Sequence, residues 1–266
     1  MLAELSAKSP APGKTSPAAV SVSTIDELHA LGYLGSADAR SATDVPEPSL
    51  LPDPKDKIEE QNLLHTAMMA SEDEEPNKAR VALEKVLQLD ESSAIALRQL
   101  GRLEMASGNY AKAAGYFRRS QDARPKDATD ASEYGRALEM SGDLPGARNV
   151  LQASLKLNPD QFAARLSLGR VYLNLNDSQA AEVQFEAAVL LQPGSSEAQI
   201  GLAKALVRQK KYADAVELLE PVAGFSSDDA EMFELLAEAY TALGRRQDAQ
   251  RAQSQARALQ KSQPPQ

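Results

Sequence analysis

The chain has 266 residues, a formal net charge of −9, no cysteine and no tryptophan. Its acidic balance argues against general binding to nucleic acid or to anionic membranes, which requires a positive surface, and the lack of cysteine excludes disulfides, thiolate metal sites and cysteine nucleophiles. Only 5% of the residues are aromatic while 42% are hydrophobic, which favours a helical protein with an alanine- and leucine-rich core.

Targeting segments are not predicted. Residues 1–15 have no apolar stretch of the kind that forms the core of a signal peptide. No apolar run approaches the ~20 residues of a membrane-spanning helix. We therefore expect a soluble chain, cytoplasmic as written, that does not insert into a membrane.

Residues 1–57 are predicted to be a flexible, Ala-, Ser- and Pro-rich segment that ends in a linker. Within it, Thr24 and Glu27 have the spacing of a capping box, which predicts a short amphipathic helix over residues 24–31. The apolar face of this helix consists of Ile25, Leu28 and Leu31. Residues 36–57 contain four prolines, so we expect them to be extended. The segment as a whole is expected to be mostly disordered.

From Glu60 onward the sequence repeats with a period of 34 residues and without insertion or deletion. The predicted repeat domain spans residues 58–263, and residues 264–266 form a short tail. Its six blocks are 60–93, 94–127, 128–161, 162–195, 196–229 and 230–263.

Several places in the block hold the same kind of residue throughout. The eighth is small: Ala67, Gly101, Gly135, Gly169, Ala203 and Ala237. The twentieth is always alanine: Ala79, Ala113, Ala147, Ala181, Ala215 and Ala249. The twenty-fourth is apolar in five blocks: Leu83, Phe117, Leu151, Phe185 and Leu219. Small residues let two antiparallel helices approach closely, and a Leu or Phe fills the space between successive hairpins.

The boundaries of the two helices in each block are also marked. Turn residues separate the helices at Gly108-Asn109, Gly142-Asp143, Asn176-Asp177 and Gly244. The thirty-second place is proline in the middle blocks, where it ends the second helix: Pro125, Pro159 and Pro193. Each block is therefore a predicted helix-turn-helix hairpin.

This pattern of an apolar-glycine pair, an aromatic residue, then Ala, Phe and Pro at period 34 resembles the tetratricopeptide repeat (TPR) family. The resemblance covers about three quarters of the chain and implies an all-α, right-handed superhelical solenoid of six repeats. The departures lie at the ends. Glu91 replaces the usual proline in the first block, and Gln253 and Lys261 replace the usual Phe and Pro in the sixth. With no complete seventh helix, the polar outer face of residues 247–261 is expected to serve as the cap.

By the same resemblance, the second, fifth, ninth, twelfth and thirteenth places of each first helix face the concave groove. In the second to fifth blocks these places hold two carboxylates, Glu139 and Glu197, and six cations: Arg98, Arg102, Arg136, Arg170, Lys204 and Arg208. The sixth block reverses the sign with Glu231, Glu234 and Glu238.

Two explanations of these cations remain open. They can form a basic groove for an extended acidic peptide, held by charge-assisted hydrogen bonds. Alternatively, each cation pairs with a Glu or Asp on an adjacent helix, or repeat duplication has copied the charge. The carboxylate clamp that other family members use for chaperone C-termini is not expected, because no Lys–Asn pair occupies the required places.

Catalytic and metal-binding constellations are not found. The two histidines, His29 and His65, are far apart in the sequence, and the acidic run Glu72-Asp73-Glu74-Glu75 lacks the spacing of an EF-hand and precedes Pro76 at a helix start. Phosphate-binding glycine loops and Ser-His-Asp sets are absent. We predict a non-catalytic scaffold that binds a protein or peptide and uses neither cofactor nor metal.

A second, shorter resemblance concerns the N-terminal segment. Leu28, residues 31–35 and residues 53–56 are similar to the junction in bacterial sulfatases that carry a C-terminal TPR array. The sulfatase nucleophile motif and metal cluster are missing from this chain. This resemblance implies an alternative in which the chain is the C-terminal portion or remnant of a sulfatase-type hydrolase, periplasmic or exported.

Overall fold

The computed structural model describes residues 54–223 and 229–262, and within these ranges it contains helices and no strand. The predicted all-α solenoid of helix-turn-helix repeats is confirmed. The predicted helix over residues 24–31, most of the linker and the tail at residues 264–266 lie outside the described residues.

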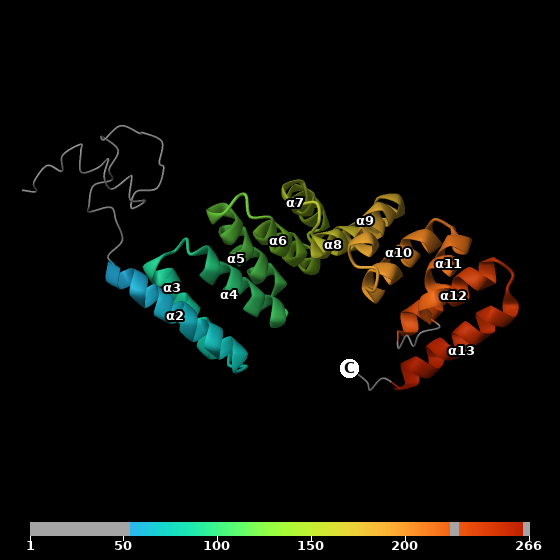
Figure 1. Ribbon diagram of the computed structural model, residues 1–266, viewed down its shortest axis with the longest axis horizontal. Helices are drawn as coiled ribbons and strands as arrows, with labels where there is room; N and C mark the ends of the chain where they lie inside the picture. Colours follow the sequence, from blue (N-terminus) through green and yellow to red (C-terminus); the bar gives the residue numbers. More distant parts are fainter. Residues whose placement is uncertain (1–53, 224–228, 263–266) are drawn as a thin grey trace, which may run out of the picture. The chain divides into compact units, whose positions relative to one another are not determined.

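The helices alternate between two sets, one from each half of a hairpin (Figure 1). We call the first set the A-helices: α2 (Pro54–Glu72), α4 (Ala94–Ala106), α6 (Ala128–Ser141), α8 (Phe162–Asn174), α10 (Ser196–Arg208) and α12 (Ala230–Ala242). The second set, the B-helices, comprises α3 (Pro76–Leu89), α5 (Tyr110–Ala123), α7 (Leu144–Leu157), α9 (Ser178–Leu191), α11 (Tyr212–Ala223) and α13 (Arg246–Ser262).

Each hairpin packs on its neighbours in chain order. Every A-helix contacts its own B-helix, and from α4 onward it also contacts the B-helix of the preceding repeat. From α6 onward successive A-helices also touch one another, as in the pairs α6–α8, α8–α10 and α10–α12. The buried core is therefore a series of linked apolar clusters along the array, as expected for a repeat protein in which each unit contacts only its neighbours.

The small eighth place lets the two helices of a hairpin pack closely. A Cβ atom on Gly101 would lie 2.6 Å from the Phe117 ring, and one on Gly135 would lie 2.5 Å from Leu151 Cγ. Real Cβ atoms essentially never show contacts below 3.0 Å, so Phe117 and Leu151 take these positions only because Gly101 and Gly135 have no side chain. The alanines of the twentieth place are all buried, at 5% exposure or less.

The fifteenth place of every repeat adopts a positive φ angle. Three of these residues are glycines, Gly108, Gly142 and Gly244, which take up this conformation without steric cost. In the other three repeats the place is filled by Glu74, Asn176 and Lys210, with φ between 57° and 63°. The left-handed residue ends each A-helix and turns the chain back into the B-helix, which fixes the hairpin geometry.

The first A-helix begins earlier than the period predicts. α2 starts at Pro54, inside the predicted linker, whereas α4, α6, α8, α10 and α12 start at the first residue of their blocks. Proline is compatible with the first turn of a helix because the amide hydrogen it lacks has no intrahelical partner there. The added turn also contains an ion pair, in which Lys57 Nζ lies 2.8 Å from Glu60 Oε2.

Candidate protein-binding surface

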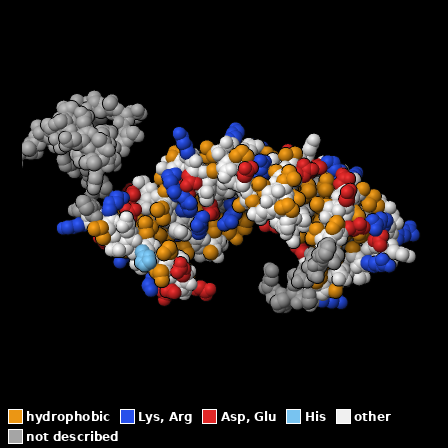
Figure 2. Space-filling model, in the orientation of Figure 1, with side chains coloured by type: hydrophobic (Ala, Val, Ile, Leu, Met, Phe, Trp, Pro, Cys, Tyr) orange, Lys and Arg blue, Asp and Glu red, His pale blue; other side chains and the backbone are white. Residues whose placement is uncertain are grey.

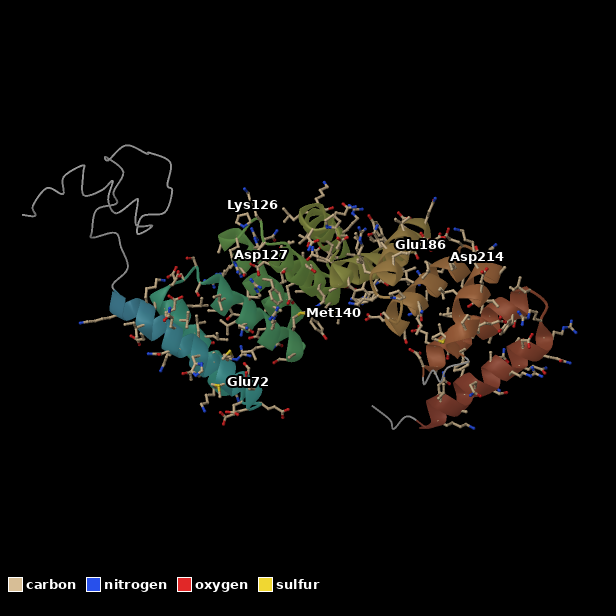
Figure 3. All side chains as sticks on the ribbon, in the orientation of Figure 1. Glu72, Lys126, Asp127, Met140, Glu186 and Asp214 are labelled. Atoms are coloured by element: carbon tan, nitrogen blue, oxygen red, sulfur yellow. The ribbon has the colours of Figure 1, made fainter. Side chains whose placement is uncertain are left out.

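The six predicted cations all lie on A-helices. We call the surface formed by the second, fifth, ninth, twelfth and thirteenth places of α4, α6, α8, α10 and α12 the A-helix face. Over the second and third repeats, basic side chains lie among acidic ones (Figure 2). Figure 3 labels Asp127 at the start of α6 and Met140 towards its end, so the two mark opposite ends of one A-helix.

Arg98, on α4, binds two carboxylates at the start of α6. Its Nε lies 2.7 Å from Asp130 Oδ1 and its Nη2 donates to Asp127 Oδ2 at 3.2 Å. Asp130 is fully buried, and Arg124 Nη2 lies 3.0 Å from its other oxygen. Burial raises the pKa of Asp130, and the two guanidinium groups oppose this shift. The cluster ties the second repeat to the third.

Arg102 and Arg136 share one carboxylate. Arg102 Nε donates to Glu133 Oε1 at 2.9 Å, a contact from α4 to α6. Arg136 Nη2 lies 3.8 Å from Glu133 Oε2, on the same helix. Both arginine side chains are more than 40% exposed, so each pair contributes little to stability on its own.

Arg170, on α8, is held from both sides. Its Nε donates to Glu139 Oε1 at 2.6 Å and its Nη2 donates to Glu139 Oε2 at 3.2 Å, a bidentate contact with α6. Its Nη1 donates to Glu197 on α10. The Glu139 side chain is only 6% exposed. Arg170 thus links three successive A-helices.

The two cations on α10 differ from each other. Lys204 Nζ lies 2.7 Å from Glu231 Oε1 on α12. Arg208 is exposed; its Nη1 donates to the backbone oxygen of Leu173, and it forms no ion pair with any carboxylate in the described ranges. Of the six predicted cations, Arg208 is therefore the one whose charge is not already matched by a carboxylate.

The sequence prediction missed several carboxylates that pair with these cations. Asp127, Asp130 and Glu133 lie outside the places predicted to face the groove. The sequence does contain one sign that Asp130 is buried. In the second, fourth, fifth and sixth repeats the same third place holds a fully buried apolar residue: Ala96, Ala164, Ala198 and Met232. A lone Asp among buried apolar residues requires a partner charge.

A continuous groove crosses α8, α10 and α12. One part, of about 430 Å³, has apolar walls from Leu173, Val207 and Leu235. Its polar lining is Asn174, three cations (Arg170, Lys204 and Arg208) and two carboxylates (Glu231 and Glu238). The adjoining part, of about 300 Å³, shares Leu173, Arg170 and Lys204 with the first and reaches Phe185. Its walls combine apolar contact area with hydrogen-bonding groups, a combination typical of ligand-binding clefts.

A second charged cluster lies inside the second repeat. Glu104 is fully buried on α4 and accepts hydrogen bonds from Asn109 Nδ2 at 2.8 Å and from Arg80 of the first repeat, while Lys112 Nζ lies 2.7 Å from it. Burial alone would raise the pKa of Glu104, but Lys112, Asn109 and Arg80 outweigh burial and lower it to about 2.

We expect Glu104→Gln to reduce the free energy of unfolding at neutral pH by about 1.5 kcal/mol, because it removes the charge that these donors solvate. The folded-state pKa lies below the ordinary value of 4.5, so this carboxylate stabilises the fold above pH 4.5 and loses that effect as pH falls towards about 2. Urea unfolding followed by circular dichroism at pH 7 and pH 3 measures the free energy of unfolding of both proteins. The difference in this free energy between wild type and variant should be smaller at pH 3. An equal difference at both pH values would contradict the lowered pKa of Glu104.

The described residues contain no group of three or more His, Asp or Glu side chains placed to hold a metal ion. His65 is exposed on α2. No helix in the ranges 54–223 and 229–262 is long and apolar enough to cross a membrane.

Comparison with known proteins agrees with the repeat architecture. Two family models, both described as tetratricopeptide repeat, match residues 70–128 and residues 138–205 and 176–237. A curated relative, the "Cellulose synthase 1 operon protein C" of Komagataeibacter xylinus, is 28% identical over an alignment of 156 residues that covers 54% of this chain. The chain spans only 12% of the length of that relative.

Solved structures share the fold. PilF of Pseudomonas aeruginosa superimposes with a TM-score of 0.66 at 19% identity, over 79% of this chain and 95% of PilF. YrrB, described as a TPR protein with an unusual peptide-binding site, superimposes with a TM-score of 0.59 at 17% identity, over 68% of this chain and 93% of YrrB. These matches concern the repeats, so the sulfatase-like junction at Leu28, residues 31–35 and residues 53–56 stays a prediction.

Proteins built from these repeats typically mediate protein interactions and are generally non-catalytic. The family models together span more than half of the chain, in register with the hairpins of the structure. The chain belongs to the tetratricopeptide repeat family.

Proposed function

We propose that this protein is a non-catalytic scaffold that binds an extended segment of another protein along its A-helix face, in the groove across α8, α10 and α12. The observation that carries the proposal is the combination of apolar walls with one exposed guanidinium, that of Arg208, that no described carboxylate neutralises. An extended chain suits such a groove because its alternate side chains point the same way.

The groove chemistry favours a particular ligand pattern. An apolar side chain would pack against Leu173, Val207 and Leu235, and an Asp or Glu nearby would accept charge-assisted hydrogen bonds from Arg208. The amide of Asn174 can both donate to and accept from a peptide backbone. We therefore propose an acidic and apolar segment as the ligand class, which refines the predicted acidic peptide.

The other five predicted cations have a different role in this proposal. Each already contacts at least one carboxylate, so an acidic ligand would have to displace that partner to use it. We assign Arg98, Arg102 and Arg170 to holding successive repeats together, whereas Arg136 pairs with Glu133 on its own helix. Lys204 lines the same groove as Arg208. Its positive charge is partly neutralised by Glu231.

Selection from a display library of random ten-residue peptides against the full chain tests this proposal. We expect enriched peptides to contain Asp or Glu beside an apolar residue. Arg208→Glu should weaken their binding at least about tenfold, since a hydrogen bond to a charged group contributes roughly 1.5–3 kcal/mol. Fluorescence anisotropy with the enriched peptides gives the dissociation constants.

Arg118→Glu is the matched control, because Arg118 is exposed on a B-helix and the substitution changes the net charge equally. This variant should bind the enriched peptides like the wild type. The proposal is overturned if no peptide is enriched, or if Arg208→Glu and Arg118→Glu have the same effect on binding.

A further inference from the structure

The last hairpin has a face that no described residue covers. In the repeats before it, the groove between the A-helix and the B-helix is occupied by the next A-helix, as α12 contacts both α10 and α11. Between α12 and α13 this place is an open cavity of about 540 Å³. Its lining includes Glu234, Ala237, Glu238, Gln253 and Ala256, together with one cation, Arg257.

The backbone at this face is suited to a helix. Ala237 and Ala256 form its buried floor, and small residues allow a helix axis to approach closely. Towards the rim, Gln253 stands where the other repeats have a buried Leu or Phe. The face between α12 and α13 therefore resembles the faces on which the A-helices of later repeats pack, but its surface is more polar.

The charges that α12 contributes to this face are the reverse of those at the earlier junctions, and Arg257 of α13 offsets them only in part. There, a cation at the ninth place of one A-helix meets a carboxylate on the next, as in Arg170 with Glu197 and Lys204 with Glu231. On α12 the ninth place is Glu238, which has no partner among the described side chains, and the fifth is Glu234, which accepts from Gln260 Nε2 at 2.5 Å.

From this reversal we infer that α12 and α13 form a docking site for an amphipathic helix of another protein that presents Lys or Arg to Glu234 and Glu238. The site shares Glu238 with the peptide groove, but the rest of its lining comes from α12 and α13, and none of it from α8 or α10. A helix that binds in a groove contacts it through side chains spaced three and four residues apart.

A second copy of this chain is a poorer occupant. The residues of α2 that would take the positions of the earlier carboxylates are Gln61, Asn62 and His65, and none of them carries a permanent positive charge. Glu59 and Glu60 lie beside them and would add like charge near Glu234. Charge complementarity therefore selects a basic helix and disfavours end-to-end stacking of copies.

The chain itself supplies a probe. A helix-stabilised peptide with the sequence of α10, Ser196–Arg208, carries the side chains that pack on a preceding repeat, and replacing its Glu197 with lysine reverses the junction charge. The peptide with the native glutamate is its control. Because the chain has no cysteine, Ala242→Cys places one environment-sensitive fluorophore at the rim of the cavity in the full-length protein.

We expect the lysine peptide to give a saturable fluorescence change and to bind at least tenfold more tightly than the glutamate peptide. Replacing both Glu234 and Glu238 with lysine should remove this preference. The matched control replaces Glu84 and Glu217, which are exposed on B-helices, with lysine and should preserve it. Equal binding of the two peptides, no saturation up to about 1 mM, or a preference that survives the Glu234 and Glu238 changes overturns the inference.

Discussion

Replacing Arg170 with glutamate is expected to lower the free energy of unfolding by about 3 kcal/mol, the low end of the cost of breaking a buried ion pair. The substitution leaves Glu139, whose side chain is 6% exposed, without its bidentate partner. It also places a third carboxylate between Glu139 and Glu197. The partial exposure of Arg170 keeps the loss from being larger.

Arg208→Glu is the natural comparison, because it makes the same charge change on the same face at a residue that forms no ion pair with a described carboxylate. Urea unfolding followed by circular dichroism at pH 7 should show a change within about 0.5 kcal/mol for this variant. If both variants unfolded at the same urea concentration as the wild type, the contacts of Arg170 would not hold the repeats together. If Arg208→Glu were as destabilising as Arg170→Glu, Arg208 would be a structural residue and a poor candidate for ligand binding.

The hairpin architecture could be predicted because its causes recur at fixed places. A small residue at the eighth place and a Leu or Phe at the twenty-fourth are needed in each hairpin, so the period exposes them. The left-handed residue at the fifteenth place was visible only where it is glycine or asparagine. Glu74 and Lys210 adopt the same conformation, and their side chains gave no sign of it.

The partners of the basic residues could not be found in the same way. The cations recur with the period, but their carboxylates do not: Asp130 is at the third place of its block, Glu133 at the sixth and Glu139 at the twelfth. A long arginine side chain can reach several positions on the neighbouring helix, so the carboxylate that pairs with it can stand at a different place in each repeat. The sequence period therefore reveals the cations but does not decide whether a ligand or a neighbouring helix carries the matching negative charge.

The start of the array was hidden for a related reason. Residues 54–59 have no counterpart in the other A-helices, because the equivalent residues there form the end of a B-helix and the turn between repeats. Four prolines in residues 36–57 indicated an extended linker, yet Pro54 opens α2. Proline is compatible both with a linker and with the first turn of a helix, so composition alone does not decide between the two.

Ala147→Leu is expected to destabilise the fold by about 2–3 kcal/mol, at the upper end of the usual cost of overpacking a core. Ala147 is fully buried on α7, in the apolar cluster that also contains Leu138 and Leu151. Gly135 faces Leu151 so closely that a Cβ there would lie 2.5 Å from it, so this hairpin has no space into which a leucine could move.

The control for this substitution is Ala111→Leu, which adds the same side chain at an exposed place near the start of α5. Alanine and leucine have similar helix propensities, so the control should change the free energy of unfolding by less than about 0.5 kcal/mol. Chemical denaturation of the three proteins distinguishes the two places. A wild-type unfolding midpoint for Ala147→Leu would mean that the helices of the third hairpin separate easily. Their close approach could then no longer explain why the twentieth place is alanine in all six repeats.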